Sequence, residues 1–293
     1  MTYRSGLVGL AGRPNVGKST LANALAGRHV AAVSPRPQTT RRSVKAVVHG
    51  EGWQAVLLDL PGFQRPADGL TRRMQATVDR SLADCDAALF VVSAAEPIGP
   101  GDRFVGERLR AVGRPVLTVV NQVDRVDRGG VAEAVGAAAD LAPFEALHPV
   151  SALTGDGLGP LREDLAGLLP EGPPYFPDGV ATDQTDEELA AELIREAALR
   201  RVREEVPHAL AVEVEEIEPR GRDEVVVHAT IVVEHESQKG IVIGAGGARV
   251  RDIGHEARLA LGRLWGRTVH LDLRVAVRRR WRRDERMLDR LGI

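Results

Sequence analysis

Short apolar runs alternate with helix-length segments through the first half of the chain. Runs with the length and composition of strands occur over 7–11, 44–49, 53–59, 87–92, 115–120 and 148–150. Only the second and third are separated by a short turn, Gly50-Glu51-Gly52, which predicts a hairpin. Alternating strands and helices predict an α/β domain with a mostly parallel, doubly wound sheet.

The pattern changes at 169–177, where four of nine residues are proline. This composition predicts a stiff linker. Beyond it the pattern predicts helices and strands in a different order: a helix over 186–205, antiparallel strands over 209–217 and 224–234, a helix, a helix over 248–264, a strand over 268–277 and a basic helix over 278–291. We therefore predict one domain over 1–171, a linker over 172–182 and a smaller α+β domain over 183–293.

The composition narrows the class of protein. A chain of 293 residues is long enough for two cores, and with 3% aromatic residues those cores must be aliphatic. The single cysteine, Cys85, suits a reducing compartment and is expected in the core. We find no signal peptide, no apolar run that could span a membrane and no histidine spacing typical of a metal site, so we expect a soluble, cytoplasmic protein without a transition metal.

The charge is distributed unevenly. The net charge is −2, but residues 239–293 carry +8 and residues 1–238 carry −10. A basic C-terminal region predicts a polyanionic partner, and a merely solvated arginine-rich face is the alternative.

Between the first predicted strand and the first predicted helix lies the stretch Gly12-Arg13-Pro14-Asn15-Val16-Gly17-Lys18-Ser19, which fits G-x-x-x-x-G-K-[ST]. In this context backbone N–H groups and a helix N-terminus point at one phosphate-binding position. Lys18 is one of only three lysines among 39 basic residues. We expect its ammonium to reach the β- and γ-phosphates, and the Ser19 hydroxyl to hold Mg²⁺.

Three more polar loops follow predicted strands: Asp59-Leu60-Pro61-Gly62, Asn121-Gln122-Val123-Asp124 and Ser151-Ala152-Leu153. Ligands of open α/β sheets bind outside the carboxyl ends of the strands. These loops are therefore expected around the same ligand as the phosphate loop.

The order of these loops resembles that of the Era family of GTPases. Pro37-Gln38-Thr39-Thr40-Arg41 resembles the family's first switch, and Gly244-Ala245-Gly246-Gly247 resembles the G-x-x-G loop of its C-terminal KH domain (type II). The resemblance extends over the whole chain. It implies a monomeric enzyme that hydrolyses GTP to GDP with Mg²⁺, binds near the 3′ end of 16S ribosomal RNA and assists assembly of the small (30S) ribosomal subunit.

The resemblance also implies roles for residues of the phosphate site. The phosphates would be bound by Asn15, Val16, Gly17, Lys18, Ser19 and Thr20. Mg²⁺ would be held by Ser19, Thr40 and, through water, Asp59, with Thr39 as the alternative to Thr40. Lys18, Thr40 and the Gly62 N–H would act on the γ-phosphate.

The guanine would be bound by Asn121, Gln122, Asp124, Ser151, Ala152 and Leu153. Asp124 can accept hydrogen bonds from the ring N–H and the amino group of guanine, and the Ala152 N–H would contact the base oxygen O6. Gln122 replaces the lysine of the family pattern, whose stem covers the purine, so we expect weaker nucleotide binding without a change of base.

RNA would be bound in the second domain by Lys239, Gly244, Ala245, Gly246, Gly247, Arg249, Arg251, Trp281 and Arg282. A G-x-x-G loop clamps the backbone of single-stranded RNA. Its middle pair here, Ala245-Gly246, lacks the family's basic residue, so the neighbouring arginines must supply the charge.

Hydrolysis raises a separate question, because Phe63 follows Gly62 where related GTPases carry a water-orienting glutamine. A slow intrinsic rate is expected, and Gln64 is a poor substitute. Asn15 could hold a potassium ion at the phosphates or only brace the loop. Two functional alternatives stay open: an RNA-binding protein with a structural nucleotide site, and a membrane-associated cell-cycle GTPase whose basic tail contacts anionic lipid.

Overall fold

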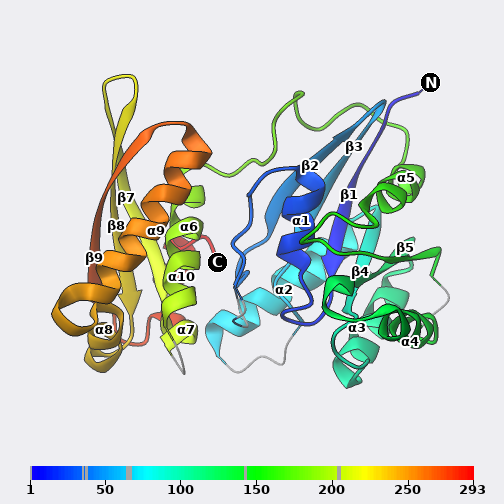
Figure 1. Ribbon diagram of the computed structural model, residues 1–293, viewed down its shortest axis with the longest axis horizontal. Helices are drawn as coiled ribbons and strands as arrows, with labels where there is room; N and C mark the ends of the chain where they lie inside the picture. Colours follow the sequence, from blue (N-terminus) through cyan, green and yellow to red (C-terminus); the bar gives the residue numbers. More distant parts are fainter. Residues whose placement is uncertain (1, 35, 37–38, 64–67, 142–143, 203–205) are drawn as a thin grey trace. The chain divides into compact units, whose positions relative to one another are not determined.

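A computed structural model describes residues 2–34, 36, 39–63, 68–141, 144–202 and 206–293 (Figure 1). The chain forms two compact units. The first comprises the described residues of 1–31, 40–65 and 74–183, and the second those of 32–39, 66–73 and 184–293. Within the described ranges, no helix combines the length and the apolar composition that crossing a bilayer requires.

The first unit is built on a six-stranded sheet of order β2-β3-β1-β4-β5-β6. Its strands are β1 (Arg4–Ala11), β2 (Val44–Gly50), β3 (Trp53–Asp59), β4 (Ala87–Ser93), β5 (Val116–Asn121) and β6 (Ala146–Pro149). Only β2 and β3 pair antiparallel, as the predicted hairpin requires, and the other neighbours pair parallel. Parallel neighbours place their carboxyl ends on one edge of the sheet, so this topology collects the predicted loops there.

Helices cover both faces of this sheet (Figure 1). They are α1 (Lys18–Ala26), α2 (Gly69–Asp84), α3 (Pro100–Val112), α4 (Arg128–Ala139) and α5 (Leu158–Leu168). Alternate strand residues separate into two aliphatic clusters: Leu89 packs with α1 and α5, whereas Phe90 packs with α2, α3 and α4. Cys85 lies in the second cluster as predicted, and its burial raises the pKa of the thiol to about 12.

The second unit carries a three-stranded sheet of order β7-β8-β9. Its elements are α6 (Asp186–Arg201), α7 (Val206–Ala209), β7 (Ala211–Arg220), β8 (Glu224–Val233), α8 (Glu236–Ile243), α9 (Ala248–Trp265), β9 (Thr268–Val277) and α10 (Glu285–Arg290). Strands β7 and β8 are antiparallel, and β9 joins β8 in parallel. The predicted order of an α/β domain followed by a smaller α+β domain is confirmed.

Helix α6 begins where its sequence predicts. The Thr185 hydroxyl accepts a hydrogen bond from the Glu188 N–H (3.3 Å), and the Glu188 carboxylate accepts one from the Thr185 N–H (3.1 Å). This capping box satisfies two backbone donors and fixes the first turn.

The predicted helix over 278–291 is wrong in its first half. Arg280 has a left-handed φ of 57°, and residues Trp281–Arg283 form a 3-10 turn. The Asp284 carboxylate then accepts hydrogen bonds from the N–H groups of Arg286 and Met287, which starts the shorter α10 at Glu285.

The predicted linker over 172–182 clusters with the first unit. The buried Gln54 side chain accepts hydrogen bonds from the N–H groups of Tyr175 (2.8 Å) and Phe176 (3.0 Å) and donates to the Phe176 carbonyl (2.8 Å). The buried Gln54 amide therefore attaches Tyr175 and Phe176 to β3. The units divide after Asp183.

Candidate functional site

The phosphate-loop sequence connects β1 to α1, and both of its glycines are required by the backbone. A Cβ on Gly12 would lie 2.3 Å from the Val91 carbonyl oxygen. Gly17 caps α1 with a φ of 92°, and a Cβ there would lie 2.3 Å from Asn121 Nδ2. Asn15 also has a positive φ, 66°, which asparagine tolerates better than most residues. The loop therefore curls tightly in front of the helix N-terminus.

Lys18 is buried inside this loop, with 6% of the residue exposed. Its ammonium donates to the carbonyl oxygens of Gly12 (3.1 Å) and Arg13 (3.0 Å). Burial lowers the pKa of Lys18 to about 8, and Asp59 partly opposes that shift. Burial makes the charged form of this lysine less favourable, so the site favours an anionic ligand that stabilises the ammonium. A phosphate chain supplies that negative charge.

Three oxygen-bearing side chains meet at the first turn of α1. The Ser19 hydroxyl donates to the Asp59 carboxylate at 2.6 Å, the Thr40 hydroxyl lies 3.1 Å from that carboxylate, and the two hydroxyls are 2.9 Å apart. Two hydroxyls and a carboxylate are hard oxygen donors of the kind that Mg²⁺ prefers.

The neighbouring threonine differs in its contacts. The Thr39 hydroxyl donates to the Arg36 carbonyl at 2.7 Å, whereas the Thr40 hydroxyl contacts Ser19 and Asp59. The geometry therefore favours Thr40 over Thr39 as the residue that contacts the metal, which stays a prediction.

Gly62 and Phe63 follow β3 and lie in different surroundings. A Cβ on Gly62 would approach the Pro14 nitrogen to 2.9 Å, so this glycine packs directly on the phosphate loop. Phe63 is buried and contacts Phe104 edge-on, with ring centroids 6.1 Å apart. A buried aromatic ring cannot orient water, in line with the slow rate expected from the sequence. Gln64 lies outside the described residues, as do Pro37 and Gln38 of the predicted switch.

The loops after β5 and β6, which are predicted to bind the base, are joined by hydrogen bonds. The Asn121 amide donates to the Val16 carbonyl (3.0 Å) and accepts from the Ala152 N–H (3.0 Å), which ties three loops together as expected. The Ser151 hydroxyl donates to the Asp124 carboxylate at 2.6 Å and orients it. The Ala152 N–H, expected to contact O6 of the base, is thus already hydrogen-bonded to Asn121.

Three other residues predicted to contact the nucleotide, Val16, Thr20 and Leu153, lie in different surroundings from one another. Val16 is buried in the core, so only its backbone faces the loop. Thr20 lies in the first turn of α1, as the phosphate role requires. Leu153 is 78% exposed and could cover one side of a base.

The predicted RNA loop joins α8 to α9. Gly244, Gly246 and Gly247 all have positive φ angles, and a Cβ on Gly244 would lie 2.8 Å from Arg249 Cβ. The guanidinium of Arg251 donates to the Gly246 carbonyl at 3.1 Å, and that of Arg249 donates to the Ile241 carbonyl. The two arginines thus lie at the loop as predicted, with Ala245 inside it and Lys239 on α8.

The structure contradicts the RNA-binding role predicted for Trp281. It is 1% exposed, and its indole N–H donates to the Ala209 carbonyl at 2.8 Å. A ring buried in the second unit cannot stack on RNA, so Trp281 is a core residue. Arg282 is half-buried and pairs with Glu234 (2.8 Å) and Asp68 (3.4 Å), which occupies the guanidinium with carboxylates instead of phosphates.

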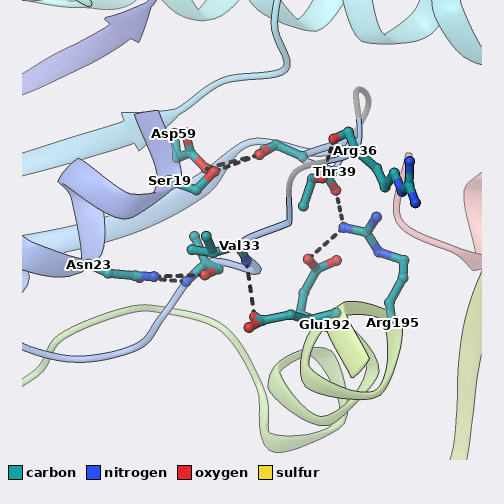
Figure 2. A network of polar contacts seen from close by, with 11 residues as sticks. Ser19, Asn23, Val33, Arg36, Thr39, Asp59, Glu192 and Arg195 are labelled. Atoms are coloured by element: carbon teal, nitrogen blue, oxygen red, sulfur yellow. Dashed lines mark hydrogen bonds and ion pairs between the residues drawn. The ribbon is translucent and has the colours of Figure 1, made fainter. Parts of the chain in front are cut away.

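A set of polar contacts in the second unit was not predicted (Figure 2). Buried Arg195 of α6 donates to the Thr39 carbonyl and pairs with Glu192 at 2.8 Å. The carboxylate of the next residue, Glu196, accepts from the Val33 N–H at 3.0 Å. The segment that leads to Thr40 is therefore attached to α6 at both ends. The available signal was a charged pair in the middle of a helix whose neighbouring positions are apolar.

Comparison with known proteins agrees with both units. A family model described as "50S ribosome-binding GTPase" matches residues 7–122, and one described as "KH domain" matches residues 205–282. The chain is 48% identical to "GTPase Era" of Mycobacterium sp. (strain KMS) over 295 residues and 48% identical to "GTPase Era" of Mycobacterium tuberculosis (strain ATCC 25177 / H37Ra) over 296 residues. Each alignment covers 99% of both chains.

Two solved structures are similar over their whole length. One is Era in complex with MgGDPNP and nucleotides 1506–1542 of 16S ribosomal RNA, and the other is a variant of Aquifex aeolicus Era bound to GDP·AlF4⁻. Each is 36% identical to this chain, covers 99% of both chains and superposes with a TM-score of 0.94. The chain therefore belongs to the Era family of GTPases.

Proposed function

We propose that this protein binds GTP with Mg²⁺, hydrolyses it to GDP, and binds the 3′ end of small-subunit ribosomal RNA. The observation that carries the enzymatic part is the convergence of three elements at the carboxyl edge of one sheet: the buried Lys18, the Ser19, Thr40 and Asp59 oxygens, and the Asp124–Ser151 pair. Steady-state hydrolysis of GTP and ATP, with and without cognate RNA, tests it. If the protein hydrolysed neither GTP nor ATP, the enzymatic part of the proposal would be contradicted.

The proposed chemistry is phosphoryl transfer to water, which depends on positioning and on neutralising charge. Ser19, Thr40 and Asp59 would hold Mg²⁺, which would neutralise charge on the phosphate oxygens. Lys18 would bind the β- and γ-phosphates, and the Gly62 N–H would donate to a γ-phosphate oxygen. Phe63 carries no polar group that could orient the attacking water, so part of the catalytic charge must come from another group.

The RNA part of the proposal rests on the relative crystallised with 16S ribosomal RNA nucleotides and on the loop between α8 and α9. We propose that the same loop binds single-stranded RNA near the 3′ end of the small-subunit RNA and that the protein assists 30S assembly in the cytoplasm. The alternative function is an RNA-binding protein whose nucleotide site is structural, and the buried Phe63 favours it. That alternative would be supported if adding RNA did not raise the rate of GTP hydrolysis. Among the described residues we find no feature that favours a peripheral membrane site.

Gly246→Asp is expected to weaken RNA binding about tenfold or more. Gly246 has a φ of 57°, which strains most side chains but which aspartate tolerates better than most, and a Cβ added to it would have no described atom within 4 Å. An aspartate therefore has room there and would place a carboxylate beside the RNA backbone. Asn has the same shape and tolerates this φ equally well, so Gly246→Asn is the matched control and should lose less affinity.

Fluorescence anisotropy with single-stranded RNA at several salt concentrations measures this effect. About four to six phosphate contacts give a log–log slope of roughly −3 to −4 for the unaltered protein. Equal affinities for the unaltered protein and Gly246→Asp would remove the loop from the RNA site.

We also propose that Asn15 holds a potassium ion beside the β- and γ-phosphates, where its side-chain oxygen would join phosphate oxygens and switch carbonyls. Turnover is then expected to be faster in KCl than in NaCl at equal ionic strength. Asn15→Ala should abolish the difference, and Asn15→Gly, which accepts the φ of 66° without strain, should do the same.

Measurements with and without RNA separate this proposal from a bracing role. Equal rates of the unaltered protein in the two salts would exclude the ion. A salt preference that persists in Asn15→Gly would show that other groups hold it.

A further inference from the structure

Gln122, which stands where the family pattern has lysine, is held by two hydrogen bonds. Its Oε1 accepts from the Ser93 hydroxyl at 2.6 Å, and its Nε2 donates to the Asn15 carbonyl at 3.2 Å. Gln122 has a left-handed φ of 69°, which directs its backbone out of β5 and its side chain across the phosphate loop. Ser93 is the last residue of β4 and pairs in register with Asn121 of β5.

The neighbouring amide makes the equivalent contact one residue further along the loop. Asn121 Nδ2 donates to the Val16 carbonyl, and Gln122 Nε2 donates to the Asn15 carbonyl. Two successive amides thus hold two successive carbonyls of the phosphate loop. The loop's shape depends on these contacts, because its carbonyls must point away from the phosphates while its N–H groups point toward them.

The serine and the glutamine suit each other chemically. The Ser93 oxygen accepts a hydrogen bond from the Ala95 N–H at 3.1 Å. The hydroxyl also has one proton to donate, and in this buried position that proton needs an acceptor. Gln122 Oε1 is that acceptor, and this bond turns the amide so that its NH₂ group faces Asn15. A lysine ammonium could donate to Asn15 but has no lone pair to accept from Ser93.

We propose that Ser93 and Gln122 act as a positioning pair that holds the phosphate loop at Asn15 in its nucleotide-binding shape. Ser93 touches neither the base nor the phosphates in this role and acts through the amide of Gln122. The pair replaces the charged contact of a lysine with a neutral one whose direction the serine sets. This inference rests on the proposed binding of guanine nucleotides.

A double-mutant cycle on the full-length protein tests the pair. The dissociation constant of a fluorescent GDP analogue is measured for the unaltered protein, Ser93→Ala, Gln122→Lys and the double variant. In the Gln122 background, Ser93→Ala should weaken binding roughly 3- to 10-fold, the effect of one buried hydrogen bond. In the Gln122→Lys background it should change binding less than about 1.5-fold, because the bond is already absent.

Loss of the Ala95 N–H contact is common to both backgrounds and cancels in the cycle. Ser93→Thr keeps the hydroxyl and should retain affinity, and thermal unfolding of nucleotide-free protein reports any general loss of stability. Equal effects of Ser93→Ala in both backgrounds would overturn the pair. Failure of the unaltered protein to bind GDP would instead overturn the proposed function.

Discussion

Thr40→Ala is expected to slow GTP hydrolysis about 100- to 1,000-fold, whereas Thr39→Ala should slow it less than about tenfold. The first change removes a hydroxyl that lies with Ser19 and Asp59, within 2.9 and 3.1 Å of their oxygens. Loss of one preorganised group at the reacting phosphate typically costs about two to three orders of magnitude in rate. The second change removes a hydroxyl whose bond among the described residues goes to the Arg36 carbonyl.

Single-turnover hydrolysis at several Mg²⁺ concentrations measures both effects. Thr40→Ser keeps the hydroxyl and should recover most of the rate, which separates metal contact from packing. The Mg²⁺ concentration for half-maximal rate should rise in Thr40→Ala and stay unchanged in Thr39→Ala. A larger defect in Thr39→Ala than in Thr40→Ala would reverse the assignment of the two threonines.

The sequence predicts which loops lie together at the edge of the sheet, because the loop types and the strand order can be read from local patterns. A glycine loop between a strand and a helix has one favourable shape, and polar loops after parallel strands lie at the same edge of the sheet. The distances around Ser19 and the bond between Ser151 and Asp124 follow from that topology. The preference for Thr40 over Thr39 came from the family resemblance and not from local pattern, because adjacent threonines differ only in where the backbone directs their side chains.

The features that sequence missed depend on partners far apart in the chain. Sequence indicated that Gln122 lacks charge and gives less cover, but its partner Ser93 lies on another strand, 29 residues away. The contact between Arg195 and the Thr39 carbonyl spans 156 residues. The RNA role of Trp281 was implied by the resemblance of the C-terminal sequence to that of the family, whereas the left-handed Arg280 precedes a Trp281 ring that is buried in the core.

The second large effect concerns recognition of the base. Asp124→Asn is expected to lower GTP affinity roughly 30- to 1,000-fold, equivalent to about 2–4 kcal/mol, and to raise affinity for xanthosine triphosphate. The asparagine oxygen can still accept from the Ser151 hydroxyl, which now lies 2.6 Å from the carboxylate. Its NH₂ group would then face the base, where guanine also presents donors and xanthine presents a carbonyl at position 2.

Competition against a fluorescent GDP analogue measures this change, with GTP, ATP and xanthosine triphosphate as competitors. Ser151→Ala is the control: it removes the orienting hydroxyl but leaves the carboxylate, so it should weaken GTP binding by less than Asp124→Asn and should not favour xanthosine triphosphate. The carboxylate accepts two donors from guanine, whereas adenine offers no ring N–H at the corresponding position. Equal competition by GTP and ATP against the unaltered protein would therefore exclude Asp124 as the group that selects guanine.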